Sequence, residues 1–176
     1  MTDWSQMVQE HGAIVWKTVS RLLDNEADAA DCFQDTFVSA LNVSRTQTVR
    51  NWPGLLKRLA TARALDRLRQ RRQESSRCTG MPEGFHPAEK AAGPSRVAEA
   101  HELTEHLCNA LVDLDHQQAE VFCLACLEDF NYRQIAEQLG LTVNHVGVLL
   151  NRARASLRER LRAHAPLSSE SLKREP

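Results

Sequence analysis

Apolar residues recur every three or four positions along most of this chain, the spacing that places them on one face of an α-helix. The pattern predicts seven helices, near Trp4 to Leu23, Glu26 to Leu41, Trp52 to Arg72, Ala98 to Val112, His116 to Leu127, Tyr132 to Leu139 and Asn144 to His164. Leu, Ala, Arg, Glu and Gln dominate these stretches and favour helices over sheets. Almost no strand is therefore expected.

The periodic pattern stops between Glu74 and Val97, where three of the seven glycines and three of the six prolines occur. Such a composition predicts a linker rather than a packed element. We therefore expect a first lobe at residues 1–73, a flexible linker at 74–97, a second lobe at 98–164 and a frayed tail at 165–176. The expected fold class is all-α, with two small helical domains that are each built around one core.

A helix-turn-helix unit is predicted in the segment from Asn131 to Leu150, where a short helix, a turn and a longer helix follow directly on one another. Asn131 is suited to cap the first helix, and Gly140 can take the left-handed conformation that ends it. The second helix of such a unit can lie in the major groove of DNA, with its first side chains on the base edges. An ordinary helical hairpin is the simpler alternative.

The net charge of -1 conceals a strong asymmetry along the chain. Residues 1–35 carry a net charge of -5, whereas residues 45–72 carry +8. Such a division favours one surface for a basic partner and another for a polyanion.

Each of these charged segments has a helical pattern. Asp28, Asp31 and Asp35 fall on one face of the second helix, and Phe33 and Phe37 lie roughly opposite. A solvated acidic face is the simpler reading of that pattern alone. In the third helix the density of arginines predicts contact with phosphate groups and salt-dependent binding. Trp52, at its start, is expected more often in a core than stacked on an unpaired base.

These segments together resemble the sigma-70 family of RNA polymerase sigma factors. Residues 110–157 resemble region 4 of that family, and the acidic and basic helices at residues 28–41 and 55–72 are similar to parts of region 2. Nothing like region 3 lies between them, which resembles the extracytoplasmic-function (ECF) class. The resemblance implies a promoter-specific transcription initiation factor whose partners are core RNA polymerase, promoter DNA and an anti-sigma factor or another regulator.

The resemblance and the chemistry of the residues themselves together lead to a set of expected binding residues. Those expected to bind polymerase are Asp28, Asp31, Gln34 and Asp35. Those expected to contact the minus-ten element are Trp52, Arg63, Arg67 and Arg71. Those expected at the element near minus thirty-five are Arg133, Thr142, Asn144, His145, Val148, Asn151, Arg152 and Arg154.

The chain departs from the family pattern in both DNA-binding segments. The basic helix has Thr61-Ala62 where relatives often carry Arg-Asn, and no formal charge occurs between Thr142 and Asn151 in the second helix of the helix-turn-helix. A lost bidentate arginine costs roughly 1 to 3 kcal/mol of base discrimination. We therefore expect base readout to rely on Asn144, His145, Val148 and Asn151, with Arg152 and Arg154 near phosphates.

Three other classes of function have weaker support. A metal or redox sensor is suggested by Cys123 and Cys126, with His101, His106 and His116 nearby, but a second ligand pair at proper spacing is missing. Buried structural cysteines are favoured, and the odd number of five cysteines indicates reduced thiols. An operator-binding regulator that does not bind polymerase is the main alternative. No phosphate loop or nucleophile motif supports an enzyme, and no cofactor is expected.

The apolar runs are shorter than the roughly 18 to 20 residues that cross a bilayer. The start, MTDWSQMVQE, lacks the basic and apolar stretches of a signal peptide. We therefore expect no membrane insertion and a cytoplasmic location.

Overall fold

The computed structural model describes residues 3–78 and 95–162, and within these ranges it contains seven helices and no strand. The helices are α1 (Trp4–Leu22), α2 (Glu26–Thr46), α3 (Trp52–Cys78), α4 (Ser95–Val112), α5 (His116–Cys126), α6 (Tyr132–Leu139) and α7 (Val143–Arg162). The predicted all-α class is confirmed.

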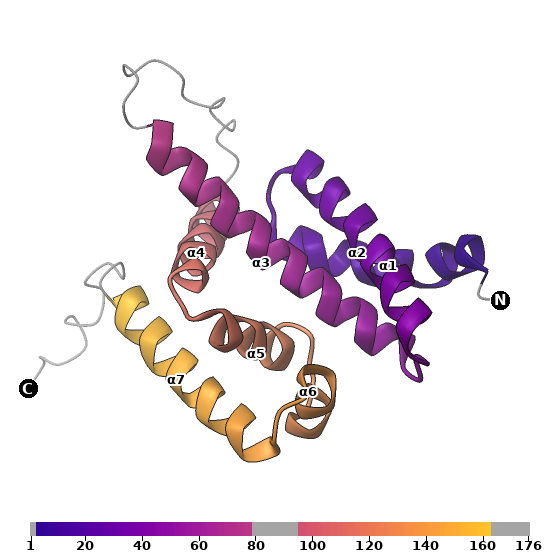
Figure 1. Ribbon diagram of the computed structural model, residues 1–176. Helices are drawn as coiled ribbons and strands as arrows, with labels where there is room; N and C mark the ends of the chain where they lie inside the picture. Colours follow the sequence, from indigo (N-terminus) through magenta and orange to yellow (C-terminus); the bar gives the residue numbers. More distant parts are fainter. Residues whose placement is uncertain (1–2, 79–94, 163–176) are drawn as a thin grey trace, which may run out of the picture.

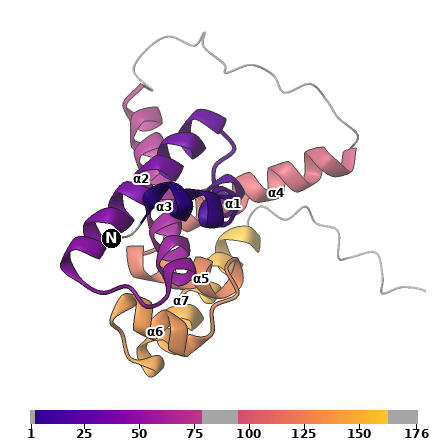
Figure 2. The ribbon, with the colours of Figure 1, turned by 90° about the vertical axis from the view of Figure 1, so that its right-hand side faces the viewer.

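The long helix α3 runs through the middle of the molecule (Figure 1). Helices α1 and α2 pack on one side of it, and α4, α5 and α6 pack on the other. Helix α7 packs in turn on α4, α5 and α6, so that α6 and α7 lie together at one end of the molecule (Figure 2).

Aspartate side chains cap the N-termini of two of the helices. Asp115 accepts hydrogen bonds from the backbone N–H groups of Gln117 and Gln118 and so caps α5. Asp3 caps α1 in the same way, because its carboxylate accepts from the backbone N–H groups of Ser5 and Gln6. These caps satisfy N–H groups that have no partner inside the helix.

Two helices are longer than their apolar patterns predict. Helix α2 continues past Leu41 to Thr46, and α3 continues past Arg72 to Cys78. The added turns are mostly exposed, so they carry no apolar repeat, but they also contain no glycine or proline to stop a helix. The ends of the predicted linker, at 74–78 and 95–97, are therefore helical, while 79–94 and the predicted tail lie outside the described residues.

A single hydrophobic cluster joins the two predicted lobes. It includes Leu22 and Leu65 from the first lobe together with Leu111, Leu114 and Leu157 from the second. A smaller cluster holds α5, α6 and α7 together. The lobes thus share part of their apolar core, because α3 packs on helices at both of its sides, a contact that the apolar pattern did not predict.

Candidate nucleic-acid interface

The helix-turn-helix unit is built by local hydrogen bonds that its sequence encodes. The Asn131 side chain accepts from the backbone N–H of Gln134, and the Gln134 side chain accepts from that of Asn131, which is a reciprocal capping box. Gly140 ends α6 at φ 65°, a left-handed conformation that a Cβ atom would strain. Ile135, Val146 and Leu150 are fully buried between the helices. The predicted helix-turn-helix is confirmed.

The exposed face of α7 carries the side chains predicted to read bases. Asn144, His145, Val148 and Asn151 are all exposed. Thr142 has a structural task as well, because its hydroxyl oxygen accepts a hydrogen bond from the backbone N–H of His145 at 3.2 Å. The first turn of α7 is therefore fixed by Thr142 and presents neutral polar and apolar groups to solvent.

Cationic side chains flank this face. Arg133 is exposed near the start of α6, and Arg152 and Arg154 are exposed within the turn that follows Asn151. One guanidinium nitrogen of Arg154 lies 3.8 Å from the sulfur of Cys126. The cations thus lie at the edges of the neutral face.

Three apolar or small residues of this face were missed from the sequence. The aromatic ring of Tyr132 lies against Gly147, where an added Cβ would be 3.7 Å from the ring. Tyr132 is 40% exposed and Val143 is 44% exposed. A glycine inside a helix is costly, and Gly147 was the one signal in the sequence of a close neighbour at this place, although a Cβ there would be in ordinary contact with the ring.

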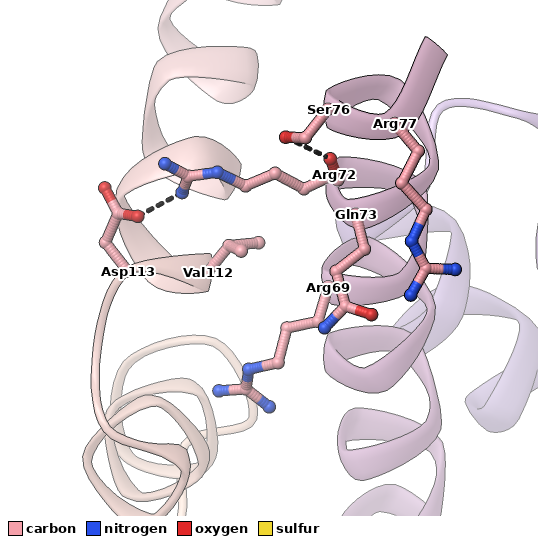
Figure 3. Close-up of a pocket in the computed structure, with 7 residues that line it drawn as sticks. All are labelled: Arg69, Arg72, Gln73, Ser76, Arg77, Val112 and Asp113. Carbon is pink, nitrogen blue, oxygen red and sulfur yellow. Dashed lines mark hydrogen bonds and ion pairs between the residues drawn. The ribbon is translucent and has the colours of Figure 1, made fainter.

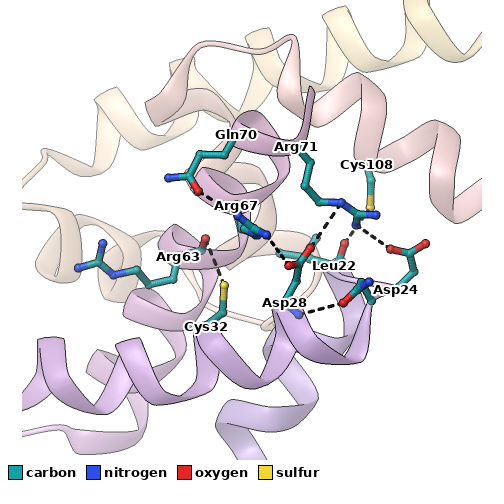
Figure 4. A network of polar contacts seen from close by, with 10 residues as sticks. Leu22, Asp24, Asp28, Cys32, Arg63, Arg67, Gln70, Arg71 and Cys108 are labelled. Atoms are coloured by element: carbon teal, nitrogen blue, oxygen red, sulfur yellow. Dashed lines mark hydrogen bonds and ion pairs between the residues drawn. The ribbon is translucent and has the colours of Figure 1, made fainter. Parts of the chain in front are cut away.

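The arginines of α3 divide between two sides of the helix. Arg67 donates to the carboxylate of Asp28 at 2.6 Å, and Arg71 lies 2.9 Å from Asp24 and 3.4 Å from Asp28 (Figure 4). The hydrogen bond to Asp28 raises the pKa of Arg67 above its ordinary value. Both arginines therefore hold α3 to the start of α2, and their charge is partly neutralised there.

Arg63 and Trp52 lie in different surroundings from each other. Arg63 is exposed and donates to the hydroxyl of Ser39 at 2.8 Å. Trp52 is half-buried, and its ring meets that of Trp4 edge to face at a centroid distance of 5.7 Å. The structure thus places Trp52 against the core, the more expected of its two roles, and leaves Arg63 open to solvent.

The acidic face of α2 is smaller than the sequence pattern predicts. Asp31, Gln34 and Asp35 are exposed, and Val38 beside them is 56% exposed. Asp28 is buried with its two arginine partners, so the structure does not place it on the same open surface. Three polar residues and one valine, here called the α2 acidic face, remain available to a partner.

The other side of α3 faces the second lobe. Arg72 reaches across to the carboxylate of Asp113 (Figure 3). The same carboxylate also lies 2.5 Å from Arg160 of α7. Arg69 lines the same pocket of about 480 Å³ (Figure 3). Two of its guanidinium nitrogens are buried without a hydrogen-bond partner, and one of them lies 3.6 Å from the carboxylate of Asp66. Arg69 is therefore held by an ion pair rather than by hydrogen bonds.

A buried carboxylate joins the two lobes between α5 and α6. Glu128 has only 4% of its side chain exposed and lies 3.1 Å from Arg21 of α1 and 3.3 Å from Lys57 of α3. Lys57 also lies over the ring of Phe130 at 5.7 Å. We call Glu128, Arg21 and Lys57 the interlobe triad. The sequence held no pattern that could pair residues so far apart.

The cysteines lie in different environments. Cys123 is fully buried, and burial raises the pKa of its thiol, whereas Cys126 is exposed. Burial also raises the pKa of Cys32 and of Cys108 to about 11. Within the described residues, no three Cys, His, Asp or Glu side chains gather in a way that could hold a metal ion. His101, part of the metal alternative, has no described side chain.

None of the helices in the two described ranges is both long enough and apolar enough to cross a membrane.

Known families match both lobes. Residues 7–74 match the family described as Sigma-70 region 2, and residues 109–157 match Sigma-70, region 4. The two matches together cover more than half of the 176 residues.

Two curated proteins are similar over much of the chain. The ECF RNA polymerase sigma factor SigE of Mycolicibacterium smegmatis is 28% identical over 173 residues, which are 97% of this chain and 66% of that protein. The ferric citrate uptake sigma factor FecI of Escherichia coli is 28% identical over 131 residues, 73% of each chain. This chain therefore spans about two thirds of the length of the first relative.

Two solved structures share the fold. The sigma factor RpoE in complex with the anti-sigma factor NepR, from Bartonella quintana, matches with a TM-score of 0.54 and 20% identity, over 94% of this chain and 100% of that one. CnrH in complex with the cytosolic domain of CnrY matches with a TM-score of 0.58 and 24% identity, over 92% of this chain and 88% of that one.

Proposed function

Because the chain belongs to the sigma-70 family of RNA polymerase sigma factors, with regions 2 and 4 in that order, we propose that it is an ECF sigma factor that binds core RNA polymerase and directs promoter-specific transcription. It would act in the cytoplasm and without catalysing a reaction of its own. The observation that carries the proposal is the presence of both matched regions on one fold, with a helix-turn-helix in the second.

The α2 acidic face is the proposed docking surface for core polymerase. Asp31, Gln34 and Asp35 are exposed together on α2, and an exposed Val38 adjoins them. A small apolar centre with charged neighbours suits a partner surface that is basic in part. Asp28 would act indirectly, by anchoring α3 to α2 through Arg67.

Helix α3 is the proposed contact with the minus-ten element. Arg63 is the most open of the three arginines named for this role. Arg67 and Arg71 keep 32% and 38% of their side chains exposed, so their outward N–H groups can meet phosphates while Asp24 and Asp28 hold the inner ones. Trp52 would support the start of α3 from its contact with Trp4.

The exposed face of α7 is the proposed contact with the element near minus thirty-five. Asn144, His145, Val148 and Asn151 would face the bases of the major groove. Arg133, Arg152 and Arg154 would hold the phosphates on either side, with Thr142 fixing the first turn of the helix.

We propose that the two lobes separate when both elements are held at once. Elements about 25 base pairs apart are roughly 85 Å apart along the duplex. Helix α3, with 27 residues, is about 40 Å long and is the longest element among the described residues. We therefore propose that the arrangement joined by the interlobe triad is a closed form, which opens when the chain engages polymerase and promoter.

A protein regulator of this chain is also proposed. The similar RpoE structure is a complex with an anti-sigma factor, and a partner of that class would compete with polymerase for the chain. Stabilising the closed form is one way in which such a regulator could act.

Run-off transcription with core RNA polymerase across a promoter library tests the proposal. Promoter-specific transcripts that require the purified chain are expected. The alternative, an operator-binding regulator, predicts binding to duplex DNA by the chain alone and no binding to core polymerase.

A further inference from the structure

We infer that α7 specifies an upstream element rich in A·T base pairs, with Asn144 and Asn151 hydrogen-bonding to adenines and Val148 packing on the methyl group of a thymine. The inference rests on the proposed function and goes further, because it assigns base chemistry to three side chains.

The three residues form one stripe on the open side of α7. Positions 144, 148 and 151 are spaced by four and three residues, so their side chains lie above one another on one face of the helix. All three are exposed, while Val146, Leu149 and Leu150 on the other side are buried in the shared core. The stripe occupies the first half of α7, the part that enters the major groove in a helix-turn-helix.

The absence of a cationic side chain from this stripe disfavours recognition of guanine. Guanine presents two acceptors in the major groove, and bidentate Arg or Lys is its commonest partner. The sequence from Thr142 to Asn151 contains neither, and the first cation of α7, Arg152, comes only after the stripe has ended. Asparagine presents a donor and an acceptor together, which matches the N6 and N7 atoms of adenine. The hydrogen-bonding capacity of the stripe therefore suits adenine.

The exposed apolar side chains of the helix-turn-helix favour contact with thymine. Val148 is 46% exposed, Val143 is 44% exposed and Tyr132 is 40% exposed, all within the helix-turn-helix unit. The C5-methyl group of thymine is the one apolar group that a normal base presents in the major groove. Burying Val148 against that methyl group would remove both from water.

The aromatic ring of Tyr132 lies over Gly147 of α7, where an added Cβ would be at an ordinary 3.7 Å from the ring. The ring thus adds apolar surface to the helix-turn-helix beside Gly147 and carries no charge.

His145, in the first turn, also carries a ring N–H group that could donate to guanine. His145 is exposed and adjacent to Asn144. Asn144 leads the stripe, whereas His145 is rotated about 100° away from it around the helix axis. His145→Ala is therefore expected to keep the preference for A·T.

The test uses holoenzyme, made from the full chain and core polymerase, on promoters randomised at both elements. Wild-type holoenzyme is expected to select A·T base pairs at the upstream positions. Asn144→Ala and Asn151→Ala are each expected to relax the preference at one adenine. Arg152→Ala is the matched control, because loss of a phosphate contact weakens binding to all sequences alike.

The methyl contact is tested by replacing thymine with deoxyuracil in the selected promoter. Removing the methyl group that Val148 covers is expected to lower the affinity of the wild-type holoenzyme about four-fold, the value of one buried carbon. Val148→Ala is expected to bind the two promoters equally. Circular dichroism melting checks that the variant folds, and alanine at this exposed helical position should not lower its stability.

Two results would overturn the inference while leaving the proposed function intact. One is promoter-specific transcription with selection of G·C at the upstream positions. The other is equal affinity of wild-type holoenzyme for thymine and deoxyuracil at every upstream position. A failure to obtain any transcript that depends on the chain would instead overturn the proposed function, and the inference with it.

Discussion

The carboxylate of Glu128, between α5 and α6, lies 3.3 Å from the ammonium group of Lys57 on α3. Arg21 of α1 completes the pairing at 3.1 Å. A carboxylate with 4% exposure is stable there only because cations from the other lobe replace its water. The proposed closed form is therefore held in part by this charged contact, in addition to the apolar cluster that the lobes share.

Replacing Glu128 with Gln should loosen the closed form. The change leaves Arg21 and Lys57 without this counter-charge, but both are about 30% exposed and can turn to water. We expect a loss of about 1–2 kcal/mol in the free energy of unfolding. A larger radius of gyration is also expected. Urea denaturation and small-angle X-ray scattering measure the two effects.

Asp129→Asn is the matched control for the interlobe triad. It removes the same charge one residue away, at an exposed position with φ 57° that asparagine also tolerates. If Glu128→Gln left both the stability and the radius of gyration at wild-type values, the triad would not hold the lobes together.

Stability should fall as pH rises through the titration of Glu120. Burial raises the pKa of this carboxyl group, against the opposing effect of Arg58, His116 and Arg69 and in line with that of Asp66. Between the ordinary carboxyl pKa of about 4.3 and the raised value, the folded protein holds a proton that the unfolded chain has released. Higher pH therefore favours unfolding across that interval.

Glu120→Gln removes the loss of stability that follows from ionising this buried carboxyl group. The variant should be more stable than wild type at neutral pH and equal to it below the ordinary carboxyl pKa, as measured by urea unfolding at several pH values. Glu137→Gln, at an exposed position of α6, should change neither. A variant that is less stable than wild type at every pH would show that the charged carboxylate is needed.

Charge reversal on the α2 acidic face should weaken binding to core polymerase. Asp31→Arg and Asp35→Arg each place a cation on an exposed site, so the fold should be kept. A loss of about ten-fold or more in affinity is expected for each, because like charges would then meet. Glu159→Arg on the exposed part of α7 is the control. Equal affinities for all three variants would move the docking surface elsewhere.

The two glycines of the helix-turn-helix should respond oppositely to alanine. Gly140→Ala should lower the free energy of unfolding by about 1–2 kcal/mol, because its φ of 65° strains any Cβ. Gly147→Ala should raise it by about 0.5–1 kcal/mol, since its Cβ would meet Tyr132 at an ordinary 3.7 Å. Thermal denaturation compares the pair, and a loss from Gly147→Ala would show that the Tyr132 ring is displaced.

Thiol alkylation should distinguish Cys126 from the other described cysteines. Burial raises the pKa of Cys32 and Cys108 to about 11, so few of these thiols ionise at pH 8. In a Cys78→Ser chain, iodoacetamide should modify Cys126 first, as followed by mass spectrometry of peptides. Equal rates at all sites would mean that the native packing around Cys32 and Cys108 opens readily.

Local features of the fold could be predicted from the sequence because the residues that produce them are close together. Asn131, Gln134 and Gly140 act within one short helix, and their roles follow from residue type and spacing. The same holds for the core face of α7. The ends of α2 and α3 could not be predicted from the apolar repeat, because exposed turns carry none.

The candidate site could be predicted only in part, because pairing across the fold has no periodicity. The spacing of Asp28 places it on the acidic face of the second helix, but in the structure its carboxylate forms an internal ion pair with Arg67. Tyr132 and Gly147 meet across the turn of the helix-turn-helix, a contact that depends on the angle between two helices.

The hydrophobic cluster that joins the lobes would give the proposed opening of the lobes a characteristic dependence on temperature. Separating Leu22 and Leu65 from Leu111 and Leu114 would hydrate apolar surface, so the open form has the larger heat capacity. The hydrophobic part of the attraction between the lobes weakens on cooling. The ion pairs of Glu128 are electrostatic, so they are not weakened by that effect. In the cold, the charged contacts therefore carry a larger share of what keeps the closed form together.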